Sequence, residues 1–146
     1  MLCYYYKFTV VRNPYTRLIS AYYYLKNGGD NAHDKDDWEK YCSKYNGIYE
    51  FIKYGLKLAS EEQLHFKPQY LFICDKNKNL LTDKIIKYET VRNDFKLLME
   101  ELKIVNIILP HLNKSTNYSI ITFSDNYKKM IQDIYKLDFR LLGYGY

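Results

Sequence analysis

The feature that most constrains the fold of this chain is an apolar run that passes directly into a helix start. Residues 4–11, YYYKFTVV, are aromatic and β-branched with almost no charge, a pattern typical of a strand buried on both faces of a parallel sheet. Asn13 can cap the following helix, and Pro14 suits its first turn, where no amide hydrogen is needed. The segment therefore predicts a strand and then a helix running to about Lys26, ended by a Gly-Gly pair.

The predicted helix has two distinct faces. Its buried stripe, at i, i+3, i+4 and i+7, consists of Leu18, Ala21, Tyr22 and Leu25. A helix start that follows a strand directs amide groups and a positive dipole at one spot, where Arg12 adds a guanidinium and Ser20 a hydroxyl from the same side. The arrangement predicts an anion site. The alternative is that Arg12 pairs with a core carboxylate and Ser20 faces a neighbouring helix.

The size and composition are those of one globular domain over residues 1–146. No window reaches the roughly 18 to 20 uncharged apolar residues of a membrane span, and no signal peptide begins the chain. We therefore expect a cytoplasmic protein. The three cysteines form no CxxC pair, so neither a disulfide framework nor a zinc site is indicated.

Neither the net charge nor the high tyrosine content identifies a ligand for this chain. A net charge of +5 suits an anionic ligand, but the lysines are spread along the whole chain. The 18 tyrosines accompany many Lys, Asn and Ile residues, a composition typical of AT-rich codons, so no nucleic-acid partner is expected. His33 lies among four aspartates in residues 30–37; such clusters are usually solvated, and no metal is expected.

The remaining elements are predicted from periodicity and capping residues. We expect a polar loop over 27–37, a short helix from Trp38 with Asp36 and Glu39 as a capping box, and helices over 48–54 and 60–66. A strand over 83–89 precedes a helix capped by Thr90, with the stripe Phe95, Leu98, Met99 and Leu102. A last helix from Asp125 is expected to bury Tyr127, Met130, Ile131 and Ile134. The sum is an α/β chain with few strands.

Five segments together resemble one enzyme family. VRNPYTRLISAYYY closely resembles the 3′-phosphate-binding segment of sulfotransferases that use 3′-phosphoadenosine 5′-phosphosulfate (PAPS). The resemblance continues in order with HFKPQ at 65–69, DKIIKYETVRNDF at 83–95, LPHLNKS at 109–115 and YKLDFRLLGY at 135–144. These segments mark the carbohydrate (family 2, Golgi-type) sulfotransferases and their bacterial relatives. The resemblance makes the Golgi lumen or membrane the alternative location if an N-terminal anchor has been lost. The resemblance implies a three-layer α/β fold like that of P-loop kinases, with a central parallel sheet, and an enzyme.

The resemblance also implies a reaction and a site. A sulfuryl group passes from PAPS to a hydroxyl, here of a carbohydrate, so the expected partners are a nucleotide co-substrate and a glycan acceptor. Arg12 and Ser20 are expected to bind the 3′-phosphate of PAPS, and no metal is needed. Lys114 and Ser115 lie in a loop from which a charge and a hydroxyl can reach a cofactor phosphate; the alternative is a solvated lysine in a turn.

The chain departs from the family at its start. Such enzymes begin with a strand, a phosphate-cradling loop containing Gly and Lys with Ser or Thr, and a helix, and none of these precedes residue 8. We therefore expect an N-terminally truncated domain without the first strand and the phosphosulfate loop, inactive alone, whose open sheet edge favours self-association. The alternative function is a non-catalytic module that binds a nucleotide or a partner.

His65 is the candidate catalytic residue. A neutral imidazole can take a proton from an acceptor hydroxyl that attacks sulfur. In several family members, however, the histidine base precedes the 3′-phosphate segment, and we expect that base to be lacking here. Whether His65 is the base, shapes the acceptor side or is a structural histidine stays open at this point.

Overall fold

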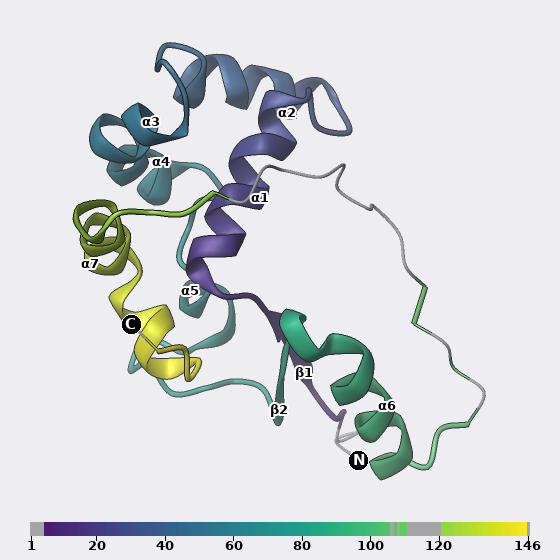
Figure 1. Ribbon diagram of the computed structural model, residues 1–146. Coiled ribbons are helices and arrows are strands. Elements are labelled where there is room, and N and C mark those ends of the chain that lie inside the picture. The colour runs from purple at the N-terminus through teal and green to yellow at the C-terminus, as the bar shows by residue number, and fades with distance from the viewer. Residues whose placement is uncertain (1–4, 106, 108, 111–120, 146) are drawn as a thin grey trace. The chain divides into compact units, whose positions relative to one another are not determined.

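The computed structural model describes residues 5–105, 107, 109–110 and 121–145, and the chain divides into two compact units. Unit 1 consists of residues 1–12 and 73–122, and unit 2 of residues 13–72 and 123–146. Figure 1 labels their helices and strands. The mixture of helices with a parallel pair of strands confirms the predicted α/β class. That residues 1–146 form a single domain stays a prediction.

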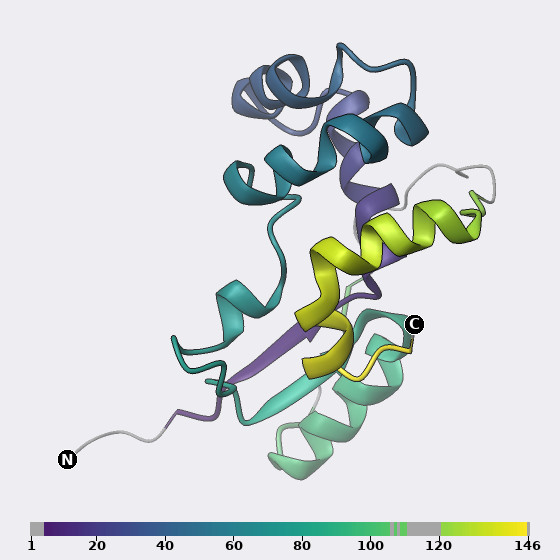
Figure 2. The same cartoon turned by 90° about the vertical axis from the view of Figure 1, so that its left-hand side faces the viewer.

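Unit 1 is built on two parallel strands, β1 (Phe8–Val11) and β2 (Lys84–Lys87). Phe8 pairs with Lys84 and Val11 with Lys87, so both strands end at the same edge of the sheet. A 3-10 turn, η2 (Tyr88–Thr90), and a helix, α6 (Val91–Glu101), follow β2 directly. Figure 2 shows the two strands side by side with α6 next to them. The predicted strand over 83–89 is thus confirmed in its central residues.

Helix α6 covers the sheet with the apolar stripe that the sequence predicts. Leu98 and Met99 are buried with Ile86 of β2, and the partly buried Phe95 and Leu102 pack around them. Thr90 holds the N-cap position but makes no capping hydrogen bond. Its hydroxyl donates instead to the carboxylate of Asp94 at 2.5 Å.

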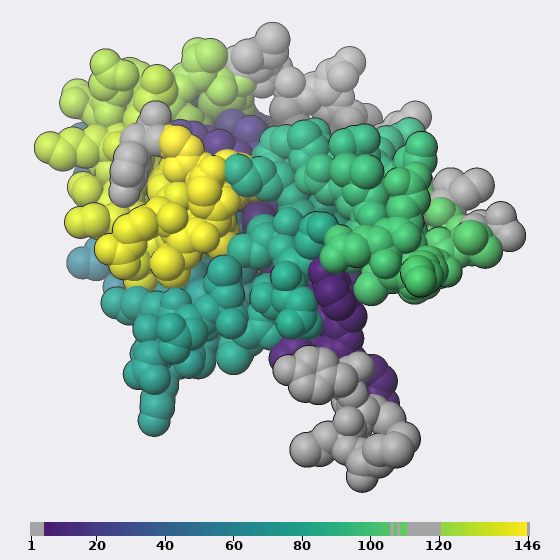
Figure 3. All heavy atoms as spheres, turned by 90° about the horizontal axis from the view of Figure 1, so that it is seen from below, coloured from purple at the N-terminus to yellow at the C-terminus, as the bar shows by residue number. Residues whose placement is uncertain are grey.

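Strand β1 is shorter and more exposed than predicted. The expectation of a strand over 4–11 buried on both faces is wrong, because Phe8 and Val10 are 42% and 47% exposed. Helix α6 packs mainly on β2 and reaches β1 through Phe95, whose ring centroid lies 6.3 Å from that of Phe8. Figure 3 shows part of β1, in purple, at the molecular surface beside the green atoms of α6. Self-association through this strand stays a prediction.

Unit 2 is helical. Its elements are α1 (Pro14–Lys26), α2 (Ala32–Asp37), the π-helical turn η1 (Trp38–Cys42), α3 (Ile48–Tyr54), α4 (Leu56–Glu62) and α7 (Asp125–Leu141), while α5 (Tyr70–Ile73) begins in unit 2 and ends in unit 1. Helix α1 contacts α7, α2 and η1, and α3 contacts α4 and α7. The largest fully buried side chains of this core include Tyr22, Leu25, Phe51, Leu56, Phe66, Ile131, Tyr135 and Phe139.

Helix α1 forms as predicted. The side chain of Asn13 accepts a hydrogen bond from the Tyr15 amide at 3.0 Å, and Pro14 occupies the first turn. The helix ends at Lys26, where the Asn27 amide donates to the carbonyl of Tyr23 at 3.0 Å. The predicted stripe Leu18, Ala21, Tyr22 and Leu25 is buried. Local capping and periodicity were sufficient to define this element.

The predicted loop over 27–37 is helical in its second half. Asn31 caps α2, because its side-chain oxygen accepts from the Asp34 amide at 3.1 Å and its side-chain nitrogen donates to Asp34 Oδ2 at 2.9 Å. The helix then continues into η1, so the predicted separate start at Trp38 with an Asp36–Glu39 capping box is wrong. The loop was predicted from the polar composition of this segment, and the reciprocal hydrogen bonds between Asn31 and Asp34 were overlooked.

Two other predictions for unit 2 are wrong: one concerns the end of a helix and the other the buried face of a helix. The helix predicted over 60–66 ends at Glu62, since Gln63 adopts an extended conformation. Helix α7 begins at Asp125 as predicted, but Met130 is 37% exposed. The buried face of α7 consists of Ile131, Tyr135, Asp138 and Phe139, and the backbone is non-helical at Tyr135.

Candidate functional site

The carboxyl edge of the two strands places Arg12 and Tyr88 together. Arg12 follows the last residue of β1 and Tyr88 the last residue of β2, and those last residues are paired. The guanidinium carbon of Arg12 lies 4.5 Å from the centroid of the Tyr88 ring, a cation–π arrangement. Since the N–H donors of a guanidinium lie in its plane, stacking on a ring leaves them in a geometry that suits phosphate. This edge can hold an anion.

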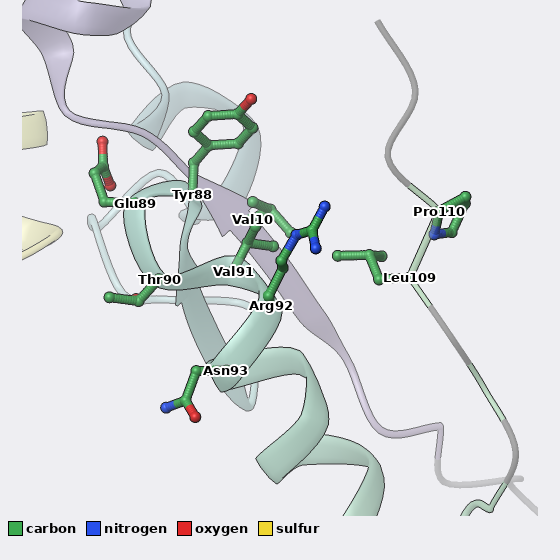
Figure 4. A pocket seen from close by; sticks show the side chains of 9 residues that line it. All are labelled: Val10, Tyr88, Glu89, Thr90, Val91, Arg92, Asn93, Leu109 and Pro110. Carbon is green, nitrogen blue, oxygen red and sulfur yellow. The ribbon is translucent and has the colours of Figure 1, made fainter. Parts of the chain in front are cut away.

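A cavity of about 610 Å³ lies beside Tyr88 in unit 1. Figure 4 shows Arg92 extending from the first turn of α6 toward Val10 and Leu109. The lining combines apolar side chains with a few polar ones: Val10, Tyr88, Glu89, Thr90, Val91, Arg92, Asn93, Leu109 and Pro110. Cavities of this size and composition hold drug-sized organic ligands, and ligands of open α/β sheets bind outside the carboxyl ends of the strands.

The sequence analysis missed Tyr88 and Arg92 as site residues. Part of the signal was present, because Tyr88 lies near the end of the strand predicted over 83–89, Arg12 directly follows the strand predicted over 4–11, and parallel strands end at one edge. Reading the second strand as parallel to the first would have placed Tyr88 beside Arg12. No such signal exists for Arg92, whose direction depends on how α6 packs on the sheet.

The start of α1 contributes fewer free amide groups than predicted. Pro14 has no amide hydrogen, and the Tyr15 amide is bound by the Asn13 side chain at 3.0 Å. The Arg17 amide donates to the Asn13 carbonyl at 2.9 Å. An anion near this helix start therefore depends mainly on side chains, which gives more weight to Arg12 and Ser20.

Ser20 lies in unit 2, half-buried on α1. Arg17 and Tyr24 are three residues before it and four after it, so all three side chains share one helix face. Burial lowers the pKa of Arg17, while Tyr135 and Asp138 act in the opposite direction. Because Arg12 belongs to unit 1, the joint contact of Arg12 and Ser20 with one phosphate stays a prediction.

His65 also lies in unit 2, with its side chain 39% exposed. Its Nε2 is 3.3 Å from Asp34 Oδ1, and its ring centroid is 5.1 Å from that of Tyr24. The backbone around it is fixed by side chains, since Gln63 Oε1 accepts from the His65 amide at 2.6 Å. The Tyr135 hydroxyl donates to the Phe66 carbonyl at 2.7 Å. The imidazole is thus both partly accessible and held in place.

Asp34, the partner of His65, is a buried carboxylate, only 6% exposed. Burial by itself raises the pKa of Asp34, but hydrogen bonds from the Asp30 amide, the Tyr24 hydroxyl and His65 outweigh it, and the pKa is lowered. The bond to Asp34 in turn raises the pKa of Tyr24 to about 12. The cluster therefore holds an ionised carboxylate at neutral pH.

This cluster predicts a specific loss of stability in acid. The folded pKa of Asp34 lies below its ordinary value of 3.8, so its stabilisation is present above that value and is lost as pH falls through the folded pKa. The pKa shift of Asp138 has the opposite sign, because burial raises the pKa of this carboxyl group. We expect Asp34→Asn to flatten the fall in melting temperature between about pH 5 and pH 2. The matched control is Asp36→Asn, an exposed position on α2; equal acid sensitivity of both variants would contradict the assignment.

Asp138 fixes the segment that follows His65. It is fully buried, and its carboxylate accepts from the backbone amides of Gln69 at 2.8 Å and Tyr70 at 2.9 Å. Burial raises the pKa of Asp138, while these hydrogen bonds and the charge of Arg17 act against it. Asp138 thus satisfies two amide groups at the start of α5.

The remaining sequence predictions concern Lys114 and Ser115, a metal and a membrane span. Lys114 and Ser115 lie outside the described residues. Within residues 5–105, 107, 109–110 and 121–145 no group of His, Cys, Asp and Glu side chains could hold a metal ion. In the same part of the chain, no helix has both the length and the apolar character required to cross a membrane.

The fold is that of an α/β protein with Arg12 stacked on Tyr88 at the carboxyl edge of its parallel strands, a position that suits an anionic ligand. Residues 1–145 match the model of the sulfotransferase family, and the chain therefore belongs to this family. Comparisons with curated proteins and with solved structures found no match. Membership confirms the resemblance and the sulfotransferase-like fold class, and it implies sulfuryl transfer in general, for which the family generally uses PAPS.

Proposed function

We propose that this chain is a sulfotransferase domain that binds PAPS through Arg12 and Ser20 at the 3′-phosphate. The reaction of such a domain is sulfuryl transfer to a carbohydrate hydroxyl, and we expect that these 146 residues do not carry it out alone. In that reaction the acceptor oxygen forms a bond to sulfur while the bond from sulfur to the bridging phosphate oxygen breaks. The products are a sulfate ester and adenosine 3′,5′-bisphosphate. The observation that carries the proposal is Arg12, stacked on Tyr88 at the carboxyl edge of the parallel strands.

The geometry of Arg12 supports recognition of a phosphate. A charge-assisted, bidentate contact from a guanidinium is among the stronger interactions that a protein makes with phosphate. Stacking on Tyr88 at 4.5 Å restricts the side chain before the ligand arrives, which reduces the entropy lost on binding. The neighbouring cavity of about 610 Å³ has the size and the apolar walls to take the nucleoside part.

The remaining roles follow from the family resemblance. Lys114 and Ser115 are proposed to reach a phosphate of the cofactor, as the matching loop of the family does. No metal is required, because positioning and electrostatic stabilisation provide most of the catalysis in transfers of this type. A glycan is the proposed acceptor.

The proposal predicts which nucleotide binds more tightly. Adenosine 3′,5′-bisphosphate should bind the unmodified chain more tightly than adenosine 5′-monophosphate, because only the first has a 3′-phosphate. Arg12→Ala should remove this preference. Loss of one charge-assisted contact is worth about 1.5 to 3 kcal/mol, or about 10- to 150-fold in affinity. Isothermal titration calorimetry measures both ligands on both proteins.

Arg140→Ala is the matched control for that experiment. Arg140 is exposed in the last turn of α7 and is not one of the proposed site residues, so its loss removes the same charge from a position with no proposed role. We expect this variant to keep the preference for the bisphosphate. Equal affinity of the unmodified chain for the two nucleotides would overturn the 3′-phosphate assignment.

A second candidate function rests on a feature of the sequence. The 146 residues contain no glycine-rich loop that continues into Lys-Ser or Lys-Thr, the element that the family resemblance assigns to the 5′-phosphosulfate. A module that binds a nucleotide or a partner without catalysis fits that feature. Binding of the bisphosphate without turnover would favour this candidate.

A further inference from the structure

The two oxygens of Asp34 have different partners. Three donors converge on Oδ2: the Tyr24 hydroxyl at 2.8 Å, the Asp30 amide at 2.9 Å and the Asn31 side-chain nitrogen at 2.9 Å. Oδ1 lies 3.3 Å from Nε2 of His65. All of these groups belong to unit 2. The carboxylate is therefore fixed on one side and faces the imidazole with the other.

This arrangement determines which imidazole nitrogen carries the proton. An ionised carboxylate can only accept hydrogen bonds, so His65 has to donate from Nε2. In the neutral ring, Nδ1 is then the nitrogen that can accept a proton. The His65 side chain is 39% exposed, and its amide is held by Gln63 at 2.6 Å. The ring is oriented by a buried acid and remains accessible.

We propose that Asp34 is a positioning residue that keeps His65 in the Nε2–H form and leaves Nδ1 to bind the acceptor hydroxyl; the second part rests on the proposed function. As the acceptor oxygen bonds to sulfur and the bridging oxygen leaves, the hydroxyl proton passes to Nδ1. The resulting imidazolium is stabilised by the charge of Asp34. A carboxylate that orients a histidine base plays the same part in other enzymes.

Asp34→Asn tests the first part because it should reverse the tautomer. The three donors around the Oδ2 position require an acceptor, so the amide oxygen of the new side chain has to occupy that position. Its NH2 group then faces His65 and can only donate. Nε2 becomes the acceptor, and the proton moves to Nδ1. The variant is therefore expected to hold the Nδ1–H tautomer, whereas the carboxylate of the unmodified chain requires the Nε2–H tautomer.

Imidazole nitrogen NMR of the 15N-labelled full chain at alkaline pH measures the tautomer directly. We expect Nε2–H in the unmodified chain, Nδ1–H in Asp34→Asn, and Nε2–H in both Asp36→Asn and Tyr24→Phe, the latter removing one donor but keeping the carboxylate. Tyr24→Phe is also the safeguard if Asp34→Asn does not fold. Nδ1–H in the unmodified chain, a change of tautomer in Tyr24→Phe, or an unchanged tautomer in a folded Asp34→Asn would each overturn the positioning role.

The proposed contact between Nδ1 of His65 and the acceptor hydroxyl is tested by a separate measurement. Adding a desulfated glycan should shift the Nδ1 resonance of His65 in the unmodified chain in the direction typical of a nitrogen that accepts a hydrogen bond. This acceptor shift should be absent in Asp34→Asn, where Nδ1 carries the proton. A glycan that leaves Nδ1 unchanged would overturn the hydroxyl contact while the tautomer result stands. Failure of the proposed function would appear elsewhere, as equal binding of the two adenosine nucleotides.

Discussion

Purified chain mixed with radiolabelled PAPS and a panel of desulfated glycans is expected to transfer no sulfate above a no-protein blank. No glycine-rich loop leading into Lys-Ser or Lys-Thr is present in the 146 residues, so no lysine and amide cluster is assigned to the charge that develops on the bridging oxygen. One such donor is commonly worth about 100- to 1,000-fold in rate. Holding PAPS at its 3′-phosphate alone also leaves the sulfur unaligned with the acceptor.

The control for this experiment is binding measured on the same preparation. Calorimetry with adenosine 3′,5′-bisphosphate shows whether the 3′-phosphate site is functional when no transfer occurs. Sulfate transfer that exceeds the blank and disappears in Arg12→Ala would contradict the prediction. It would show that these 146 residues are a complete enzyme, with His65 as the leading candidate for its base.

Asp138→Ala is expected to destabilise the chain by about 3 to 5 kcal/mol, the cost of removing one partner from a buried charged network. The carboxylate is fully buried and accepts from the Gln69 and Tyr70 amides at 2.8 and 2.9 Å. Its loss leaves these two groups without their acceptor and removes the charge that favours Arg17. Since a domain of this kind is stable by about 5 to 15 kcal/mol in total, much of the stability would be lost.

Urea unfolding of the unmodified chain, Asp138→Ala and Asp133→Ala measures this effect. Asp133 is an exposed aspartate on the same helix, so its replacement should change the free energy of unfolding by no more than about 0.5 kcal/mol. Asp138→Asn keeps the shape and one acceptor oxygen and should fall between the two. A free energy of unfolding for Asp138→Ala equal to that of Asp133→Ala would show that this carboxylate does not hold the segment after His65.

Helix α1 and the buried stripe of α6 depend on near neighbours in the chain and were predicted correctly, whereas the capping box at Asp36 and Glu39 was not. The Asn13 cap, the Pro14 start and the buried stripe of α1 are all present. The stripe of α6 packs as expected on Ile86. A cap and a helical stripe are defined by residues one to four positions apart, so the sequence contains the whole signal.

Burial was predicted less well, because it depends on what packs against an element. The composition of β1 favoured an interior strand, yet Phe8 and Val10 are exposed where α6 packs mainly on β2. The predicted buried face of α7 was wrong for the same reason, since Met130 is exposed and Asp138 is buried. An apolar side chain is able to be buried, but its type does not determine which element of the fold packs against it.

By itself, the sequence determined the family, the position of Arg12 after a strand and the helix that carries Ser20, since each is encoded in one continuous segment. Only the tertiary structure decided that Tyr88 lies under Arg12 and that Asp34 holds His65 from 31 residues away. It also decided that Asp138 is buried among backbone amides. Strand register and helix packing bring such groups together, and neither is set by the residues adjacent to them in the chain.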